Sequence, residues 1–419
     1  MPSFTARRGA LTTAAGMLLV GAAVLPAHAD SVRGQQWFLD AMKAEQMWKT
    51  STGKGITVAV LDTGVNADHP DLAGRILPGK DMASTERGDE HTDYEGHGTS
   101  MAGFIAATGA RAGGHGAFGL APGTRILPVR LPRVEKLDPA VADKEFATAM
   151  ATGIRYASDH GAKVINISQA STVGGTELTS AVKHALDKGA LVFAGVGNDG
   201  DKGNPVMYPA ATPGAVGVAA IGKNLKKTAE SEFGPQVDMA APGEDMVEAC
   251  GGRTGLCTSH GTSDATALAS ASAALIWSAH PTWTNNQVLR VMLNTIGAPV
   301  DGSKRTDAIG YGIVRPRLAL TNPGDPGPAN TYPLPDFPAK ASAPPSLSAS
   351  AAGHGRGGAA AAKEGSGTTT LGVAIGTGVV VLLGGTAAVV GARRRRRPGT
   401  AGDPISQYGQ GPADGRRSF

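Results

Sequence analysis

Six short, continuously apolar runs alternate with helical patterns in this chain, and they constrain its fold more than any other feature. The runs are "ITVAVLD", "RILPVR", "AKVINIS", "ALVFAGVG", "AVGVAAIG" and "VDMAAPG". Between two of them, "EFATAMATGIRYASDHG" places Phe146, Met150, Ile154 and Ala157 on one helical face. Strands that are apolar throughout are typical of a parallel sheet with helices on both faces. The sequence therefore predicts an α/β fold with a doubly wound, mostly parallel sheet.

The two ends of the chain carry targeting signals instead of this pattern. Residues 1–29 contain two arginines, an apolar run and a final "AHA", which predicts a secretory signal peptide. Residues 371–392 are uncharged and, at ~1.5 Å per residue, long enough to span a bilayer. A buried core helix is the alternative, but the "RRRRR" that follows is typical of a stop-transfer signal. We therefore expect one C-terminal transmembrane helix, an extracytoplasmic body and a cytoplasmic tail at 393–419.

The rest of the chain divides by composition. Residues 321–370 are rich in Pro, Ala, Gly and Ser and have few large apolar side chains, which predicts an extended linker. The folded body is then expected at 56–320, preceded by an N-terminal extension at 30–55. The net charge of +4 comes from the two ends, because residues 30–392 contain 30 Lys and Arg against 33 Asp and Glu. This balance argues against a nucleic-acid partner.

The chain has two cysteines, Cys250 and Cys257, with six residues between them. In an exported protein such a pair predicts a disulfide that closes a small loop. A metal site is the alternative, but two thiols without a pair of histidines disfavour it. We expect no metal site and no cofactor.

Residues suited to acyl transfer stand at the ends of predicted strands or the starts of predicted helices. Asp62 ends the strand "ITVAVLD", His97 follows a glycine in "YEGHGTSMAG", and Ser263 opens the helix after "SHGT". An Asx turn at Asp62 and a helix N-cap at Ser263 are the structural alternatives. Serine acyl transfer needs a hydroxyl, an imidazole and a carboxylate, and Asn198 at the end of "LVFAGVGN" could donate to the oxyanion. Together, in the order Asp, His, Ser, these residues predict a serine hydrolase.

The segments "VAVLDTGV", "GHGTSMAG", "GVGN" and "GTSDA" resemble the subtilisin-like serine proteases over roughly residues 37–320. The resemblance implies Asp62 as the residue that orients His97, His97 as general base, Ser263 as nucleophile, and Asn198 in the oxyanion hole. The segment "QQWFLDAMKAEQMWKTSTGKGITVAVLDTGV" and the linker with its apolar span are similar to the mycosins. That family comprises membrane-anchored subtilisin-like proteases of type VII secretion systems.

The chain departs from the family pattern at several positions. Asp264 stands after the serine where a hydrophobic residue is usual, and it places negative charge near a developing oxyanion. The cleft-lining segment reads Ser168, Gln169 and Ala170 instead of Ser-hydrophobic-Gly, so the expected substrate-binding walls change. The 30–55 extension is too short for a separately folded inhibitor. The similarity to the mycosins implies that it wraps the body and remains attached.

Two functions follow from these residues. The first is a membrane-anchored extracytoplasmic serine endopeptidase that cuts protein or peptide substrates through an acyl-enzyme, on or within a type VII secretion system. The second is a protease-fold scaffold that stabilises the secretion complex. An α/β-hydrolase esterase is disfavoured, because Ser263 lacks a G-x-S-x-G elbow and the order of the triad differs.

Overall fold

The structure, a computed structural model, describes residues 31–134 and 137–337. The predicted signal peptide (1–29), transmembrane helix (371–392) and cytoplasmic tail (393–419) lie outside the described residues, as does most of the predicted linker. In the part of the chain that is described, no helix is both long and apolar enough to cross a bilayer.

The body is built on a parallel sheet, as the sequence predicts. Within the described residues the sheet has seven strands in the order β2-β3-β1-β4-β5-β6-β7, and every pairing is parallel. The strands are β1 (Thr57–Asp62), β2 (Lys80–Asp81), β3 (Arg125–Arg130), β4 (Val164–Ile167), β5 (Leu191–Gly195), β6 (Val216–Ile221) and β7 (Met239–Pro242). A separate antiparallel hairpin joins β8 (Met246–Ala249) to β9 (Leu256–Ser259).

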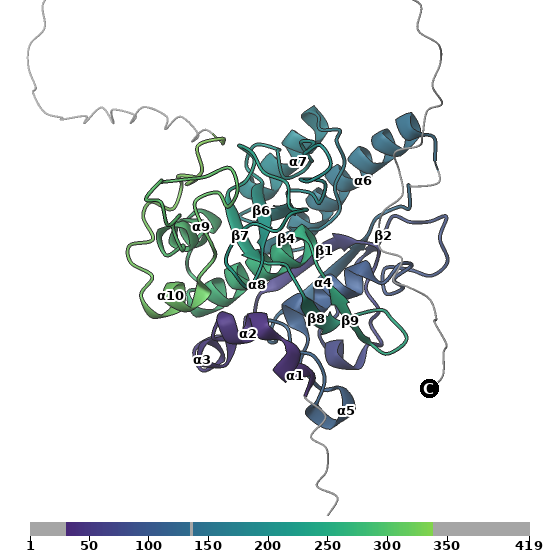
Figure 1. The fold of residues 1–419 in the computed structure, drawn as a ribbon. Coiled ribbons are helices and arrows are strands. Elements are labelled where there is room, and N and C mark those ends of the chain that lie inside the picture. The colour runs from purple at the N-terminus through teal and green to yellow at the C-terminus, as the bar shows by residue number, and fades with distance from the viewer. Residues whose placement is uncertain (1–30, 135–136, 338–419) are drawn as a thin grey trace, which may run out of the picture. The chain divides into compact units, whose positions relative to one another are not determined.

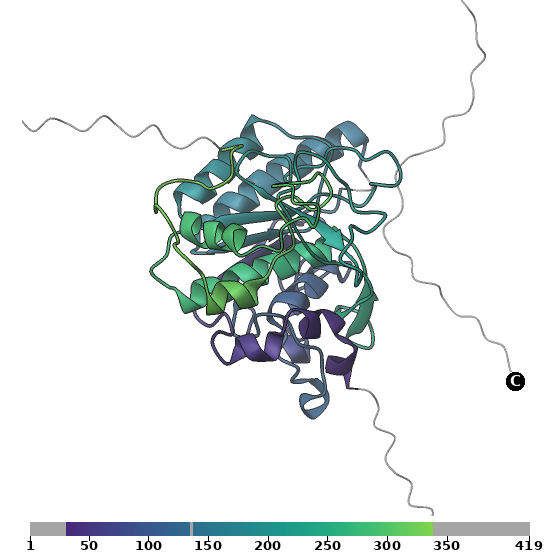
Figure 2. The ribbon, with the colours of Figure 1, turned by 60° about the vertical axis from the view of Figure 1, so that its left-hand side comes forward.

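Helices cover both faces of this sheet (Figure 1). The helices α6 and α7 lie on one face, and α4 and α8 lie on the other, an arrangement that is also seen from the second direction in Figure 2. The helices are α1 (Val32–Gln35), α2 (Trp37–Ala41), α3 (Ala44–Trp48), η1 (Pro70–Leu72), α4 (His97–Ala106), α5 (Arg111–Gly114), α6 (Pro139–Asp159), α7 (Thr176–Asp187), α8 (Thr262–Ala279), α9 (Asn285–Asn294) and α10 (Pro316–Thr321). The predicted doubly wound α/β fold is thereby confirmed.

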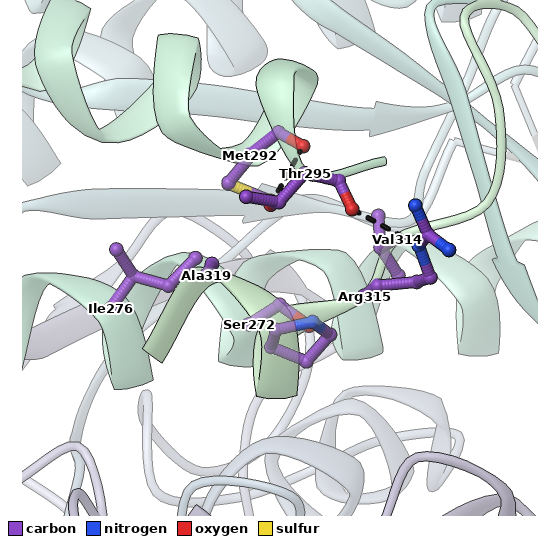
Figure 3. Close-up of a pocket in the computed structure, with 8 residues that line it drawn as sticks. Ser272, Ile276, Met292, Thr295, Val314, Arg315 and Ala319 are labelled. Carbon is purple, nitrogen blue, oxygen red and sulfur yellow. Dashed lines mark hydrogen bonds between the residues drawn. The ribbon is translucent and has the colours of Figure 1, made fainter. Parts of the chain in front are cut away.

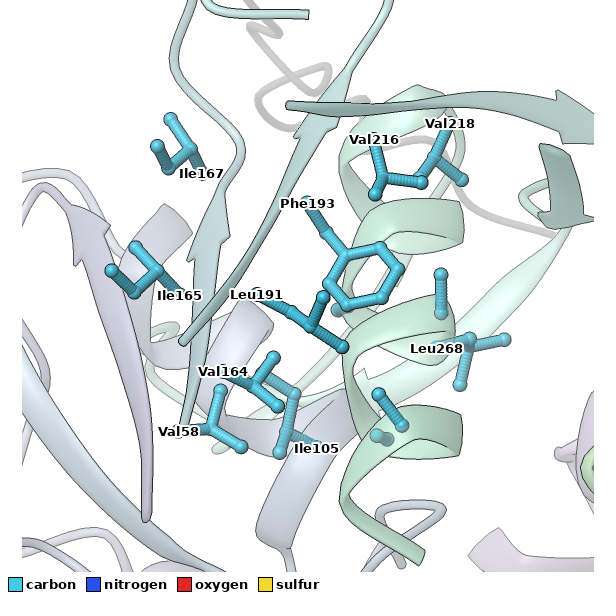
Figure 4. Packing of buried hydrophobic residues seen from close by; sticks show 14 of the residues in the cluster. Val58, Ile105, Val164, Ile165, Ile167, Leu191, Phe193, Val216, Val218 and Leu268 are labelled. Atoms are coloured by element: carbon cyan, nitrogen blue, oxygen red, sulfur yellow. The ribbon is translucent and has the colours of Figure 1, made fainter. Parts of the chain in front are cut away.

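The hydrophobic core lies between the sheet and its helices. Leu191 and Phe193 point from β5 towards α8 (Figure 4), and both belong to the buried hydrophobic cluster that also includes Leu268 of α8. Helix α8 consists mostly of Ala, Ser and Thr, and its residues 262–277 are all buried. Small side chains let this helix pack closely on the sheet along its length, which fixes the position of its N-terminus at the sheet edge.

The N-terminal extension is part of the folded body. Phe38 is fully buried and packs edge-on against Phe104 of α4, with ring centroids 5.6 Å apart. The Gln36 side chain donates to the carbonyl oxygens of Phe118 (2.8 Å) and Val247 (3.0 Å) and accepts from the Phe118 N–H (2.9 Å). The extension therefore joins two distant segments of the body.

Residues 322–337 differ from the linker predicted at 321–370, because they pack on the body. Tyr332 and Leu334 are buried, and the Tyr332 hydroxyl donates to the Gly214 carbonyl at 2.8 Å. Arg290 of α9 donates to the carbonyls of Pro326, Pro328 and Thr331. Two buried apolar side chains and the half-buried Arg290 guanidinium hold this Pro-rich stretch, although its average composition is typical of a linker.

A small pocket lies where α10 approaches α8 and α9 (Figure 3). Its walls include Ser272, Met292 and Thr295, and the Arg315 Nε donates to the Thr295 carbonyl at 3.0 Å. None of the residues predicted to carry chemistry lines this pocket, so it is a packing feature of the helices.

Candidate active site

The predicted catalytic residues gather at the carboxyl-terminal edge of the parallel sheet. Asp62 is the last residue of β1, Ser168 directly follows β4, and Asn198 lies in the loop after β5. His97 is the first residue of α4, and Ser263 is the second residue of α8. In parallel α/β sheets this edge is where ligands and catalytic groups collect.

Asp62 and His97 are joined directly. The His97 Nδ1 donates to Asp62 Oδ1 at 2.7 Å, and the Thr63 N–H donates to the same oxygen at 2.8 Å. The Asp62 side chain is inaccessible to solvent, whereas 24% of the His97 side chain is exposed. This geometry fixes the orientation of the His97 ring and the tautomer with the proton on Nδ1. His97 Nε2 is therefore left as the proton acceptor.

The electrostatics of His97 favour its protonated form. Burial of the ring lowers its pKa, but the negative charge of Asp62 and the hydrogen bond to it outweigh burial. More distant charges on Asp264 and Glu95 act in the same direction, and the result is a pKa raised to about 9. The imidazole is therefore fully available as a base only in alkaline solution.

Asp93 holds the start of α4 in place, and the sequence analysis above does not include it. Its two carboxylate oxygens accept from the N–H groups of Gly96 (2.6 Å) and Thr99 (2.7 Å) and from the Thr63 hydroxyl (2.7 Å). An acidic residue just before a helix is a capping signal, and "DYEGHGT" contains it. The start of α4 also packs closely on the loop after β1, because a Cβ at position 98 would collide with the Gly64 carbonyl.

Ser263 lies at the N-terminus of α8, after Gly261 with φ 131°. Its hydroxyl donates to the Ser168 carbonyl at 3.3 Å, and the Ser168 hydroxyl donates back to the Ser263 carbonyl at 3.2 Å. Among the described residues, no hydrogen bond joins the Ser263 hydroxyl to His97. Catalytic hydrogen bonds are often long or misaligned without substrate, and rotation about the serine χ1 redirects the hydroxyl.

Asn198 is anchored through its carbonyl oxygen. Asn198 Oδ1 accepts from the Thr262 N–H at 2.9 Å and from the Thr262 hydroxyl at 3.1 Å. Because the oxygen is occupied, the amide Nδ2 is the end of the side chain left to donate to another group. The Asn198 loop and the first turn of α8 are thus held together.

The three predicted substrate-binding residues follow β4 and are each half-buried. Ser168 accepts from Asn166 Nδ2 at 3.3 Å, in addition to its exchange with Ser263. Gln169 reaches back towards the catalytic pair, with Nε2 3.3 Å from Asp62 Oδ1. Ala170 offers no polar side chain, and Ser171 beyond it pairs with Tyr208.

The disulfide predicted between Cys250 and Cys257 is present and links β8 to β9. The turn of this hairpin lies against the start of α4, because Gly251 contacts the backbone of Gly96. The hairpin is therefore a wall of the site beside His97.

Three buried acids surround the site, and the sequence predicts the burial of none of them. Glu248 of β8 and Asp264 of α8 are each 1% exposed, and Glu232 is fully buried against Gly197, next to Asn198. Burial raises the pKa of Glu248 to about 9, that of Asp264 to about 6 and that of Glu232 to about 8. In a sequence these acids look like surface acids, so no pattern indicates their burial.

No group of three or more His, Cys, Asp or Glu side chains within the described residues is arranged to hold a metal ion.

The fold and its relatives define a serine endopeptidase of the subtilisin-like type. The sequence matches the Subtilase family (Peptidase S8) over residues 53–331, so the chain belongs to this family. It is 39% identical to thermitase from Thermoactinomyces vulgaris over 209 residues, which cover 50% of this chain and 70% of thermitase. It is 34% identical to subtilisin E from Bacillus subtilis, over 57% of this chain and 59% of that protein.

Solved structures of mycosins are similar to this one. MycP1 from Mycobacterium smegmatis superimposes with a TM-score of 0.61 at 28% identity, covering 76% of this chain and 89% of MycP1. MycP3 protease from the type VII (ESX-3) secretion system gives a TM-score of 0.62 at 30% identity, covering 71% of this chain and 91% of MycP3. A chain in the periplasmic assembly of the ESX-5 inner membrane complex gives a TM-score of 0.62 at 28% identity, covering 77% of this chain and 92% of that chain.

Proposed function

We propose that this protein is a membrane-anchored, extracytoplasmic endopeptidase that cleaves peptide bonds with Asp62, His97 and Ser263. The observation that carries the proposal is the 2.7 Å hydrogen bond from His97 Nδ1 to the buried Asp62, beside a serine at a helix N-terminus. An oriented imidazole next to a hydroxyl is the arrangement that acyl transfer needs.

The reaction would begin when His97 Nε2 takes the proton from the Ser263 hydroxyl as its oxygen attacks the peptide carbonyl. Asp62 stabilises the imidazolium, and the Asn198 Nδ2 with the Ser263 N–H donates to the oxyanion. His97 then returns the proton to the leaving amine. Water, activated by the same imidazole, hydrolyses the acyl-enzyme and regenerates the Ser263 hydroxyl.

The substrates are proteins or peptides bound in extended form along residues 168–170. Membrane attachment rests on the apolar span at 371–392 with its following arginines, and export rests on residues 1–29. Action on or within a type VII secretion system is supported by the similarity to MycP1, MycP3 and the ESX-5 assembly.

Labelling with a fluorophosphonate tests the nucleophile in the full-length protein in native membranes. Wild type is compared with Ser263→Ala and His97→Ala, with Ser270→Ala as a control serine deeper in α8. We expect labelling of wild type and Ser270→Ala, and loss of labelling in the other two. Equal labelling of Ser263→Ala and wild type would rule out Ser263 as the nucleophile.

A scaffold role in the secretion complex is the second candidate. It is favoured by the similarity to a chain within the ESX-5 assembly, and by the Ser263 hydroxyl pointing to Ser168 instead of His97. Secretion measured in cells that carry Ser263→Ala separates the two functions. Secretion by the variant at the wild-type level supports the scaffold, and loss of secretion with the variant still in the membrane supports the protease.

A further inference from the structure

Gln169 lies next to the catalytic pair because of the strand register. In the parallel pairing of β1 with β4, Leu61 is opposite Ile167, so the residues that follow this pair in the two chain segments are neighbours. Asp62 and Thr63 on one chain segment therefore lie beside Ser168 and Gln169 on the other. A side chain of glutamine length can reach the Asp62 carboxylate from this position.

The contacts of Gln169 identify its amide as a donor to Asp62. Its Nε2 lies 3.3 Å from Asp62 Oδ1 and 3.5 Å from His97 Nδ1. Since His97 Nδ1 carries the proton that it donates to Asp62, it cannot also accept from an amide N–H. Asp62 Oδ1 is therefore the acceptor. Gln169 Nε2 lies close to His97 Nδ1 because both nitrogens donate to this same oxygen.

Asp62 Oδ1 thus receives three donors, from Thr63, His97 and Gln169. The other oxygen, Oδ2, is buried and has no hydrogen-bond partner within the described residues. A buried carboxylate depends on its few donors to hold its charge and its orientation. Gln169 is the member of this set that comes from the substrate-binding segment, so it links that segment to the catalytic pair.

We propose that Gln169 is a positioning residue for the Asp62–His97 pair: its amide shares Asp62 Oδ1 with the imidazole and sets both the orientation and the basicity of His97. This inference rests on the proposed function. An additional donor stabilises the carboxylate and weakens its pull on the imidazolium proton, so it brings the pKa of His97 towards neutrality. An aliphatic side chain at this position would line the cleft equally well but would supply no donor.

The test uses Gln169→Met, which keeps the length of the side chain and removes the amide, in the full-length protein. The rate of fluorophosphonate labelling is measured against pH, together with kcat and KM for a peptide. We expect the inflection of the pH profile to move upward by about half a unit to one unit. We also expect a limiting rate about three- to ten-fold lower, with KM within about two-fold of wild type.

Gln236→Met is the matched control, because Gln236 is half-buried and donates to the Phe233 carbonyl, away from the site. A Gln169→Met variant that changes KM but keeps the wild-type inflection and limiting rate would overturn the proposal and leave Gln169 as a wall of the pocket. A melting temperature equal to that of wild type shows that the variant is folded.

A second measurement does not depend on activity. The low-field NMR signal of the His97 Nδ1 proton is titrated in Ser263→Ala, with and without Gln169→Met. A higher pKa of His97 in the double variant than in Ser263→Ala supports the proposal. This holds even if wild type is not labelled and the proposed protease function is wrong. An unchanged titration overturns the proposal, even where wild type labels well.

Discussion

Asp264, the residue directly after Ser263, accepts a 2.7 Å hydrogen bond from the Ser259 hydroxyl of β9. This bond ties the first turn of α8 to the disulfide-linked hairpin. It also holds a carboxyl group at the N-terminus of the helix that would donate to the oxyanion. Its charge state therefore bears on the reactivity of Ser263.

Replacing Asp264 with asparagine should speed acylation near neutral pH. Burial raises the pKa of Asp264 to about 6, so the side chain is neutral below that pH and negative above it. The negative form opposes the oxyanion and raises the pKa of His97. Asp264→Asn should label with fluorophosphonate a few-fold faster than wild type at pH 8 and at a similar rate at pH 5.

Ser259→Ala is the companion variant. The Ser259 hydroxyl lowers the pKa of Asp264, so its loss should keep Asp264 protonated to higher pH. We expect labelling at pH 7 to be faster than in wild type and slower than in Asp264→Asn. Slower labelling of both variants at every pH would show that the Asp264 charge assists catalysis.

Wild type should show an alkaline profile. The pKa of His97 is raised to about 9, so the fraction of neutral imidazole grows about ten-fold per pH unit below that value. The labelling rate should rise accordingly from pH 6 and level off near pH 9. A plateau already reached at pH 7 would contradict the predicted charge balance of the Asp62–His97 pair.

Replacing Glu248 with glutamine should stabilise the protein as pH rises. Burial raises the pKa of Glu248 from 4.5 to about 9, and the hydroxyl groups of Ser259 and Ser100 offset only part of this effect. Between those two values only the unfolded chain loses the proton, so wild-type stability falls with rising pH. Glutamine cannot ionise and avoids this loss.

The difference in unfolding free energy between Glu248→Gln and wild type should grow by up to about 1.4 kcal/mol per pH unit between pH 5 and pH 9. Urea unfolding at these two pH values measures it. Glu177→Gln, at an exposed position of α7, is the control and should show no such growth. A constant difference across the pH range would mean that Glu248 ionises normally in the folded protein.

Replacing Asn198 with alanine should lower kcat by about 10²–10³ and leave KM little changed, because the lost donor acts on the oxyanion. Asn198→Asp keeps the oxygen that accepts from Thr262 and removes the donor. It should be as slow as the alanine variant while remaining as stable as wild type. A fully active aspartate variant would place the oxyanion donor elsewhere.

The N-terminal extension should be retained in the mature protein. Gln36 is fully buried, and Gln36→Ala leaves the Phe118 N–H and the Phe118 and Val247 carbonyls without their partner, at a cost of at least about 2 kcal/mol. Gln46→Ala, on the exposed side of α3, should be neutral. Intact mass of the mature protein checks retention, and a chain that begins after residue 55 would refute it.

The sequence predicts the parts of this fold whose pattern repeats. The short, continuously apolar runs identify the sheet, and Asp62, His97 and Ser263 are predicted together because they stand where strands end or helices begin. The two-residue strand β2 and the hairpin β8–β9 are too short or too polar to produce a periodic signal. Glu248 and Gln169 act through tertiary contacts, which depend on strand register and packing and leave no local motif.

The stretch 322–337 fixes the point from which the rest of the chain departs. Asp336 accepts from the Gly214 N–H at 3.0 Å, and Phe337 lies against Gly214, two residues before β6 begins. The exit point is thus at the amino-terminal edge of the sheet, whereas Asp62 and Asn198 are at the opposite edge. The length of the strands, about 20 Å for six residues, separates Phe337 from the catalytic residues. A protein bound at this edge would therefore leave the edge that carries Asp62 and Asn198 unobstructed.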